Sequence, residues 1–402
     1  MQIPQPKKKL RVLMIAPQPW FQPRGTPFSV LHRIKAMSLL GHSIDLATYH
    51  IGEDVPIDNL NIYRSRRVPF IKTIKIGPSK SKILLDAALF FTASGLLKRN
   101  RYDLIHTHEE ASFFGDYFAR KYNIPHLYDM HSSLPQQLSN FKYTKSAWIK
   151  KIFEKLEERT IRSAQAVITI CPELDQYVES RFPKKTHILI ENVADNSIVF
   201  PADKVDREKL KSAFHLNGAP VILYYGTFEA YQGLDLLLQS ANELINNRHI
   251  NVRFLLIGGN EKQIEKYKAL TRQYGLDEHV QFTGFVKPQW IPAFISLARL
   301  LVSPRISGTN SPLKLYSYLR SGKPIVATRH ITHTQILDDS VSVLVEPKPV
   351  DFADGIGYLL QNEEQGRQLA ANAQRLAQKK YDYGHFLEKT EWILERAAGA
   401  TI

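Results

Sequence analysis

Short apolar runs alternate with helical patterns along the whole chain. Apolar runs of strand length occupy residues 10–16, 44–47, 62–68, 102–109, 126–131, 166–171 and 188–190 in the first half, and residues 220–225, 252–259, 280–284, 298–304, 325–327 and 341–346 in the second. Segments of helical spacing, such as residues 29–40, 82–98, 146–163 and 234–244, separate many of them. Such alternation predicts an α/β protein with doubly wound parallel sheets.

Length and charge set further bounds. A chain of 402 residues is too long for one ordinary core and predicts two domains, which we place at residues 1–197 and 198–383, with a helical segment at 384–402. Residues 1–200 hold 29 lysines and arginines against 18 aspartates and glutamates, a net +11, whereas residues 201–402 hold 24 against 21, a net +3. The first domain is therefore expected to meet an anionic partner, which we take to be a membrane surface. Nucleic acid is not predicted because no recognition motif accompanies the charge, and a merely soluble basic surface is the alternative.

The location expected from these features is cytoplasmic and peripheral to the inner face of the plasma membrane. A single cysteine, Cys171, excludes an internal disulfide. The longest apolar run, residues 83–97, is short for a membrane span and contains Asp86. The helix around it is either a core helix or a surface that grips the tail of a lipid acceptor.

A second helix carries a more explicit amphipathic pattern. Residues 146–163 place Trp148, Phe153 and Leu156 on one side and several lysines elsewhere, which suits the interface of an anionic bilayer. Packing of this helix on its own sheet is the alternative.

The segment from 305 to 328 has the pattern of an anion site. A polar loop containing Gly308 leads through Pro312 into a helix, and we expect Asn310 or Ser311 to cap that helix. Unpaired amides at a helix start favour anions, and Lys314 adds a full charge there.

Polar side chains also end two strands of the first domain. His106 and His108 form a His-x-His pattern that we expect to point to opposite faces of its strand, with no third ligand at metal-site spacing. Asp129 and His131 end the next strand and are expected to line the same cleft as His108.

Together these segments resemble family-4 glycosyltransferases of the GT-B type. The resemblance rests on the Pro-x-Lys helix start at residues 312–314, Ser-Gly-Lys-Pro at 321–324, His-Glu at 108–109 and the Glu-Asn-Val-Ala-Asp junction at 191–195. It implies two Rossmann-like domains facing across a cleft, with the C-terminal helix returning to the first domain. The implied catalytic residues are His108 and Lys314, and the implied acceptor-side residues are Glu109, Asp129 and His131. The implied donor-binding residues are Arg24, Gly25, Gly226, Thr227, Gln232, Arg305, Asn310, Ser311, Pro312, Leu313 and Ser317.

The chain departs from the family pattern at four positions. An arginine and a lysine usually stand where this chain has Thr227 and Gln232, and two glutamates where it has Thr309 and Ser317. Neutral groups donate hydrogen bonds but do not cancel charge, so the charge of the phosphates falls on Lys314, with Arg305 and Arg24 as further candidates.

The resemblance implies a retaining transferase that moves a hexose from a nucleoside diphosphate sugar to a glycan or lipid-linked acceptor. No cofactor and no metal are expected, because the chain contains no Asp-x-Asp clamp. Two alternatives remain, a GT-B hydrolase or epimerase of sugar nucleotides, and a non-catalytic GT-B subunit that binds nucleotide.

Overall fold

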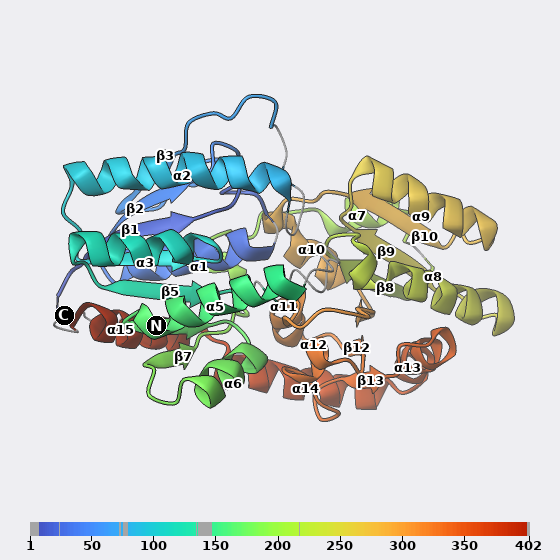
Figure 1. Cartoon of the computed structure of the whole chain (residues 1–402). Helices are drawn as coiled ribbons and strands as arrows, with labels where there is room; N and C mark the ends of the chain where they lie inside the picture. The colour runs from blue at the N-terminus through green and yellow to red at the C-terminus, as the bar shows by residue number, and fades with distance from the viewer. Residues whose placement is uncertain are drawn as a thin grey trace. The chain divides into compact units, whose positions relative to one another are not determined.

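The structure is a computed structural model that describes residues 8–23, 25–71, 74, 79–133, 135, 147–216 and 218–399. The chain divides into two units, which are described separately (Figure 1). The first comprises Met1–Asn192 with Tyr383–Ile402, and the second comprises Val193–Asp382. These boundaries lie close to those placed from the sequence at residues 197 and 383, and the C-terminal helix is part of the first unit.

The first unit is built on a seven-stranded parallel sheet with the order β3-β2-β1-β4-β5-β6-β7. All of its strand pairs are parallel. The strand order reverses direction between β1 and β4, as in a doubly wound fold, where ligands bind beyond the carboxyl ends of the strands. The strands are β1 (Arg11–Ala16), β2 (Ser43–Thr48), β3 (Leu60–Arg64), β4 (Leu104–His108), β5 (His126–Met130), β6 (Ala166–Thr169) and β7 (His187–Leu189).

Helices cover both faces of this sheet. Helix α1 (Gly25–Leu39) packs against α15 (Tyr383–Gly399), whereas α3 (Ala111–Tyr122) packs between α2 (Lys80–Arg99) and α5 (Ala147–Ser163). Right-handed crossovers place α1 on the face opposite α2, α3, α5 and α6 (Pro172–Arg181), because only the β1–β2–β3 connections run in the other direction across the sheet.

The second unit repeats this architecture with a six-stranded parallel sheet of order β10-β9-β8-β11-β12-β13. Its strands are β8 (Val221–Tyr225), β9 (Arg253–Ile257), β10 (Val280–Gly284), β11 (Leu300–Ser303), β12 (Ile325–Thr328) and β13 (Val343–Val345). Its helices are α7 (Arg207–Ala213), α8 (Leu234–Asn242), α9 (Glu261–Gln273), α10 (Ile291–Leu297), α11 (Lys314–Arg320), α12 (Ile331–Thr334), α13 (Pro349–Gln361) and α14 (Glu363–Lys380).

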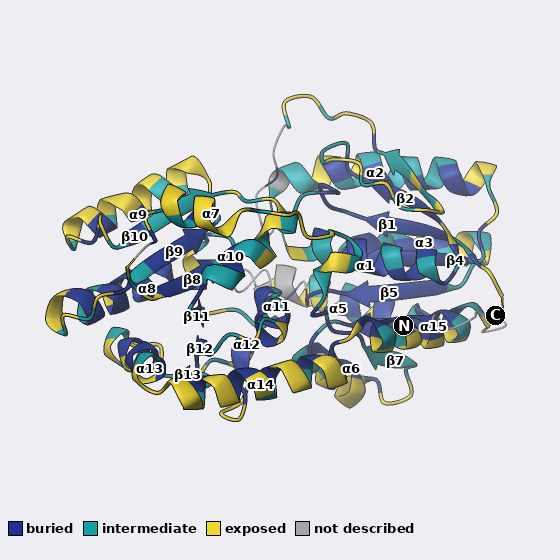
Figure 2. Ribbon diagram, turned by 180° about the vertical axis from the view of Figure 1, so that it is seen from behind, coloured by how far each residue is buried: buried dark blue, intermediate teal, exposed yellow. Residues whose placement is uncertain are grey.

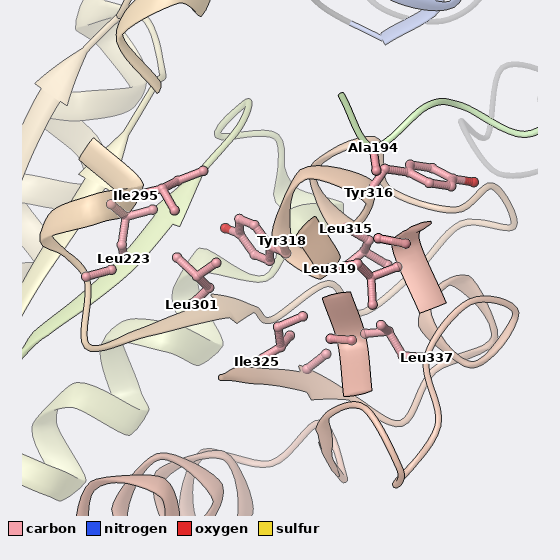
Figure 3. Packing of buried hydrophobic residues seen from close by; sticks show 14 of the residues in the cluster. Ala194, Leu223, Ile295, Leu301, Leu315, Tyr316, Tyr318, Leu319, Ile325 and Leu337 are labelled. Atoms are coloured by element: carbon pink, nitrogen blue, oxygen red, sulfur yellow. The ribbon is translucent and has the colours of Figure 1, made fainter. Parts of the chain in front are cut away.

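Burial follows the layers in each unit, with buried strands and helices exposed on their outer sides (Figure 2). In the second unit, α11 turns Leu315, Tyr316 and Leu319 into a core shared with β11 and β12 (Figure 3). Four of the seven residues of this short helix belong to that core. The core, rather than a capping hydrogen bond, therefore holds α11 against β11 and β12. The expectation that Asn310 or Ser311 caps it was wrong. The helix begins at Lys314, and its N-cap residue, Leu313, makes no side-chain cap bond.

Several element boundaries differ from the sequence expectations. Helix α1 begins at Gly25 rather than at residue 29, so Gly25 opens a helix instead of lying in a loop. Helices α3 and α9 were not predicted, although α9 carries a clear start signal. Its Asn260 accepts from the Gln263 backbone N–H, and the Gln263 side chain accepts from the Asn260 N–H, a reciprocal capping box.

The helix containing the longest apolar run is α2. Over the part of the chain that the structure describes, no helix combines the length and hydrophobicity needed to cross a membrane.

Candidate functional site

A group of polar side chains lies at the carboxyl ends of β4 and β5 in the first unit. His108 is the last residue of β4 and lies opposite Asp129 of β5 in the strand register. His131 follows β5, and its Nε2 lies 2.9 Å from His108 Nδ1 and 3.3 Å from Asp129 Oδ1. His106 Nε2 lies 3.4 Å from the other carboxylate oxygen. The three predicted residues His108, Asp129 and His131 are therefore brought together, and all are buried.

The expected orientation of the two β4 histidines was wrong. Their rings stack with centroids 4.7 Å apart, because residues two apart in a strand point to the same face. The expectation that no third metal ligand lies near the two histidines was wrong as well. His106, His108 and Asp129 each offer a ligand atom, and these atoms lie within 4.8 Å of one another. The absence of a metal stays a prediction.

Arg33 argues against a cation at this place. Its Nε donates to Asp129 Oδ2 at 3.0 Å, so a fixed positive charge already neutralises the carboxylate. The guanidinium also donates to Thr390 Oγ1 at 3.2 Å and lies over the Phe386 ring, both on α15. Arg33 is only 3% exposed and was missed from the sequence, where its signal is a charged residue among the apolar positions of a helix.

The electrostatics of the group follow from burial and from this ion pair. Burial by itself raises the pKa of Asp129, but the Arg33 guanidinium and the neighbouring histidines outweigh it and hold that pKa well below its usual value. Burial lowers the pKa of His108 well below its ordinary 6.5, and the Asp129 charge only partly opposes this. His108 is therefore neutral at pH 7. Its Nε2 is buried and has no hydrogen-bond partner among the residues that the structure describes.

The other predicted residues of this unit lie near the same sheet edge. Glu109 follows His108 directly, has a left-handed φ of 49°, and accepts from Thr26 Oγ1 at 2.9 Å. Gly25 is exposed at the start of α1 with a φ of 34°, and no atom within 4 Å would meet an added Cβ. Positive φ, rather than close approach of another group, is thus what favours glycine there. Arg24 lies outside the described residues.

In the second unit, Lys314 is a buried cation beside the carboxyl end of β8. Its side chain is 5% exposed, and its Nζ donates to Gln232 Oε1 at 3.1 Å and lies 3.8 Å from the centre of the Tyr224 ring. Neither Lys314 nor Arg305 is paired with a carboxylate in the described part of the chain. Burial, reinforced by the charge of Arg305, lowers the pKa of Lys314 well below 10.5.

The loop after β8 is shaped around this lysine. Gly226 has a φ of 148°, and a Cβ added there would lie 3.1 Å from Lys314 Nζ and from the Tyr224 hydroxyl. That hydroxyl donates to the Thr227 carbonyl at 2.7 Å, and Gln232 Nε2 donates to Thr227 Oγ1 at 3.4 Å. Thr227, Gln232 and Lys314 are therefore linked through the Gln232 side chain, with Gly226 beside them, and their role in donor binding stays a prediction. Tyr224, whose ring contacts the Lys314 ammonium, was missed because it stands in an apolar strand pattern like any core residue.

Arg305 is anchored next to this group. Its guanidinium lies over the Tyr231 ring, and its Nε donates to the Ser307 carbonyl at 2.9 Å. The Thr328 hydroxyl donates to the Arg305 carbonyl. His333, also missed from the sequence, bonds Ser303 Oγ through Nε2 at 2.8 Å and the Thr328 carbonyl through Nδ1 at 2.8 Å.

The remaining predicted residues surround the start of α11. Pro312 and Leu313 lead into it, and the Leu315 N–H donates to the Pro312 carbonyl at 3.0 Å. The Ser311 hydroxyl is buried without a hydrogen-bond partner in the described residues. Ser317 lies one turn further and accepts from Asn196 Nδ2 at 3.2 Å, while the Thr309 carbonyl accepts from Gln335. Asn310 precedes the helix, whose N-cap residue is Leu313.

Two family descriptions match the chain in succession. The description of Glycosyltransferase Family 4 matches residues 23–195, and that of Glycosyl transferases group 1 matches residues 206–376. The chain belongs to these glycosyltransferases. The transferase is 24% identical to the alpha-D-kanosaminyltransferase of Streptomyces kanamyceticus over 67% of this chain and 70% of that protein. It is 23% identical to the phosphatidyl-myo-inositol mannosyltransferase of Mycobacterium leprae over 97% of each chain.

Solved structures show the same fold. The sucrose-phosphate synthase of Thermosynechococcus elongatus matches the transferase with a TM-score of 0.79 at 16% identity, over 97% of this chain and 100% of that one. HepE of Anabaena, solved in complex with UDP, matches with a TM-score of 0.72 at 15% identity, over 96% and 99%. The GT-B fold and the family expected from the sequence are confirmed.

The Arg33–Asp129 pair generates a prediction about stability. Asp129→Asn should lower the free energy of unfolding by about 3–5 kcal/mol, because it leaves the Arg33 charge buried without its partner. Chemical denaturation measures this, with Asp54→Asn as control. Asp54 pairs with Arg64 at the surface, so its loss should cost under about 1 kcal/mol. The Asp129 contribution should be present above pH 3.8 and lost as the pH falls through its depressed pKa.

Replacing both members of the pair separates this charge effect from packing. Arg33→Met combined with Asp129→Asn should recover part of the lost stability, since no unpaired charge remains. Equal destabilisation by Asp129→Asn and by the double variant would contradict the assignment.

Proposed function

We propose that the protein is a retaining glycosyltransferase that moves a hexose from a nucleoside diphosphate sugar to a glycan or lipid-linked acceptor, as in surface polysaccharide or glycolipid assembly. The observation that carries the donor part is Lys314, a buried lysine without a carboxylate partner in the described residues. A buried cation costs free energy unless it is paired, so the site is completed by an anion. The structural relative HepE was solved with UDP, which supports a diphosphate at this place.

The site suits the chemistry of a leaving diphosphate. Negative charge grows on that group as the glycosidic bond breaks, so a fixed lysine stabilises the transition state more than the ground state. Lys314 and Arg305 supply the charge, Thr227 and Gln232 supply neutral hydrogen-bonding groups, and Gly226 keeps the place beside Lys314 Nζ free of a side chain. A metal ion is not required in this proposal, because the two cations perform its electrostatic role.

His108 is proposed to orient the reacting sugar. It is neutral at pH 7 because burial lowers its pKa, so it acts through a hydrogen bond rather than through charge. The Nδ1 atom is occupied by His131 at 2.9 Å, which leaves Nε2 for the sugar. Glu109, Asp129 and His131 are proposed to hold the acceptor side of the site.

A second candidate function is nucleotide binding without catalysis. It is favoured by the neutral residues Thr227, Gln232, Thr309 and Ser317 where the family carries charges. A sugar-nucleotide hydrolase or epimerase is the other alternative. Nucleotide release measured with and without acceptor separates the three. Release that depends on acceptor supports transfer, and release without acceptor supports hydrolysis. No release supports a binding subunit if the donor sugar is unchanged, and an epimerase if the donor sugar is converted.

The proposed partner, besides donor and acceptor, is an anionic membrane surface on the cytoplasmic side. The net charge of +11 on residues 1–200 supports it, because basic surfaces are drawn to anionic lipids. The mannosyltransferase relative is named for a lipid acceptor, phosphatidyl-myo-inositol, which agrees with a lipid-linked acceptor here.

Lys314 is the first residue to test. Lys314→Met keeps the packing on Tyr224 but removes the charge, so nucleoside diphosphate should bind about 10- to 100-fold more weakly while the bare nucleoside binds as before. Lys323→Met is the matched control, since Lys323 follows α11 and its Nζ donates to the Ser296 carbonyl. Adding Gln232→Lys to Lys314→Met should restore part of the affinity, because the two side-chain ends lie 3.1 Å apart. Unchanged diphosphate affinity in Lys314→Met would refute the donor site.

The depressed pKa of Lys314 adds a pH-dependent prediction. An incoming anion favours the charged lysine, so diphosphate binding should take up a proton between the depressed pKa and 10.5, and affinity should fall as the pH rises through that window. Calorimetry in two buffers of different ionisation enthalpy measures the uptake. Lys314→Met should abolish it, and equal uptake in both proteins would assign the proton to another group.

His108 is tested by turnover. His108→Ala should lower turnover by about 10²-fold with little change in nucleotide affinity. His108→Gln should retain more activity than His108→Asn, since a glutamine amide reaches the place of Nε2. The control is His126→Ala, because His126 is equally buried in the same sheet but begins β5, and its Nε2 bonds Thr107 Oγ1. A turnover number unaltered by His108→Ala at saturating substrates would reject the role.

A further inference from the structure

Helix α2 carries apolar side chains on its outer side as well as its inner side. Leu85, Leu89 and Ala93 are buried in the core of the first unit. On the opposite side, Ile83 is 66% exposed and Phe91 is 73% exposed, with Leu84 exposed beside them. These positions recur at helical spacing and form one stripe, unlike the single exposed apolar residues common on protein surfaces. Of the two alternatives left open for this helix, a core helix accounts only for the inner side.

The stripe continues across the neighbouring helices of the same layer. Tyr117 of α3 is exposed and packs its ring against Phe90 of α2, with centroids 5.9 Å apart. On α5, which packs on the other side of α3, Trp148 is 72% exposed. Ile152, Phe153 and Leu156 on the apolar side of α5 are half-buried, and Phe153 contacts Phe113 of α3. Packing on the sheet thus accounts for most of that side, and α2 contributes more of the exposed apolar surface.

Exposed cations outnumber exposed carboxylates on this face. On α2, α3 and α5, eight lysines and arginines are exposed against one exposed carboxylate, Glu154, among the side chains that the structure describes. Several of these cations lie in the last turns of their helices, where the helix dipole already accounts for them. Lys151 and Lys155 lie in the first half of α5, where the dipole gives no such reason.

The cations also line a hollow. A depression of about 350 Å³ lies between α3 and α5 and is bordered by Arg120, Lys155, Arg159 and Arg162 with Glu158. Arg120 and Arg159 are paired with Asp116, and Arg162 with Glu158, whereas Lys155 has no carboxylate partner among the described residues. An arginine offers several donors at once, so a phosphate headgroup can still accept hydrogen bonds from these side chains and from Lys155.

We propose that the outer face of α2, α3 and α5 docks on the surface of an anionic bilayer, with Ile83, Phe91 and Trp148 inserted and the lysines and arginines on lipid phosphates. An apolar stripe with flanking cations matches both layers of a bilayer interface, whereas a nucleic acid would leave the stripe without a role. The inference deepens the membrane partner proposed above, and glycosyl transfer does not enter its test.

The test is co-sedimentation of the full chain with phosphatidylglycerol vesicles and with phosphatidylcholine vesicles, without donor or acceptor. The unchanged protein should bind the anionic vesicles at low salt and release at high salt, since screening weakens surface electrostatics. The triple variant Lys98→Gln, Lys151→Gln, Lys155→Gln should bind about 100-fold more weakly, from roughly fivefold per cation. The control is Lys262→Gln, Lys268→Gln, Arg272→Gln on α9, which removes the same charge from the second unit.

The apolar stripe is tested by Ile83→Ser with Phe91→Ser, which should weaken vesicle binding at least tenfold. The matched control is Val350→Ser with Tyr358→Ser, because these residues are also exposed and eight positions apart, on α13. Equal binding to both lipids, binding to neither, or equal loss in the α9 and α13 controls would overturn the proposal. Acceptor-dependent nucleotide release with a soluble acceptor is measured on the same variants, so failure of docking is distinguishable from failure of transfer.

Discussion

The buried ion pair of Arg33 and Asp129 is the interaction on which the first unit depends. It joins three elements far apart in the chain, α1, β5 and α15, at the carboxyl edge of the sheet. Low dielectric makes such a pair strong when complete and costly when one partner is removed. Because Asp129 also contacts His106 and His131, the pair fixes the surroundings of His108, whose neutral state comes from burial. The C-terminal helix is thus part of the support of the candidate site.

The second unit uses the opposite arrangement. Lys314 is as deeply buried as Arg33, yet its described partners are an amide oxygen and an aromatic ring, neither of which carries a full negative charge. Such partners offset only part of the free energy that burying an ammonium costs. The uncompensated cost of burial appears as the lowered pKa of Lys314. The contrast separates a charge that is paired within the chain, Arg33, from a charge without a carboxylate partner among the described residues, Lys314, which is why Lys314 is proposed to bind the donor.

The same contrast bears on Thr227 and Gln232, the two neutral residues of the proposed donor site. Thr227 and Gln232 replace an arginine and a lysine of the family pattern, and Gln232 donates to Thr227 and accepts from Lys314. An arginine and a lysine at these two positions would place two more positive charges next to the buried Lys314 ammonium, which would repel it. The neutral pair therefore concentrates the positive charge on Lys314 and Arg305. The anchored position of Arg305, held over Tyr231 and through its carbonyl by Thr328, agrees with that division.

The sequence by itself determined the fold class, the family and most of the elements, because the periodicity of apolar residues, the turn glycines and the Pro-x-Lys segment are local signals. Two local signals were misinterpreted: the capping box at the start of α9, and the period of two that places His106 and His108 on one face of β4. Only the tertiary structure decided what each polar group meets. Arg33 and Asp129 are 96 residues apart in the chain, and Lys314 and Gln232 are 82 apart. No periodicity connects such positions, since contacts of this range are set by how strands and helices pack, and that packing decides which buried charges meet a charged partner within the chain.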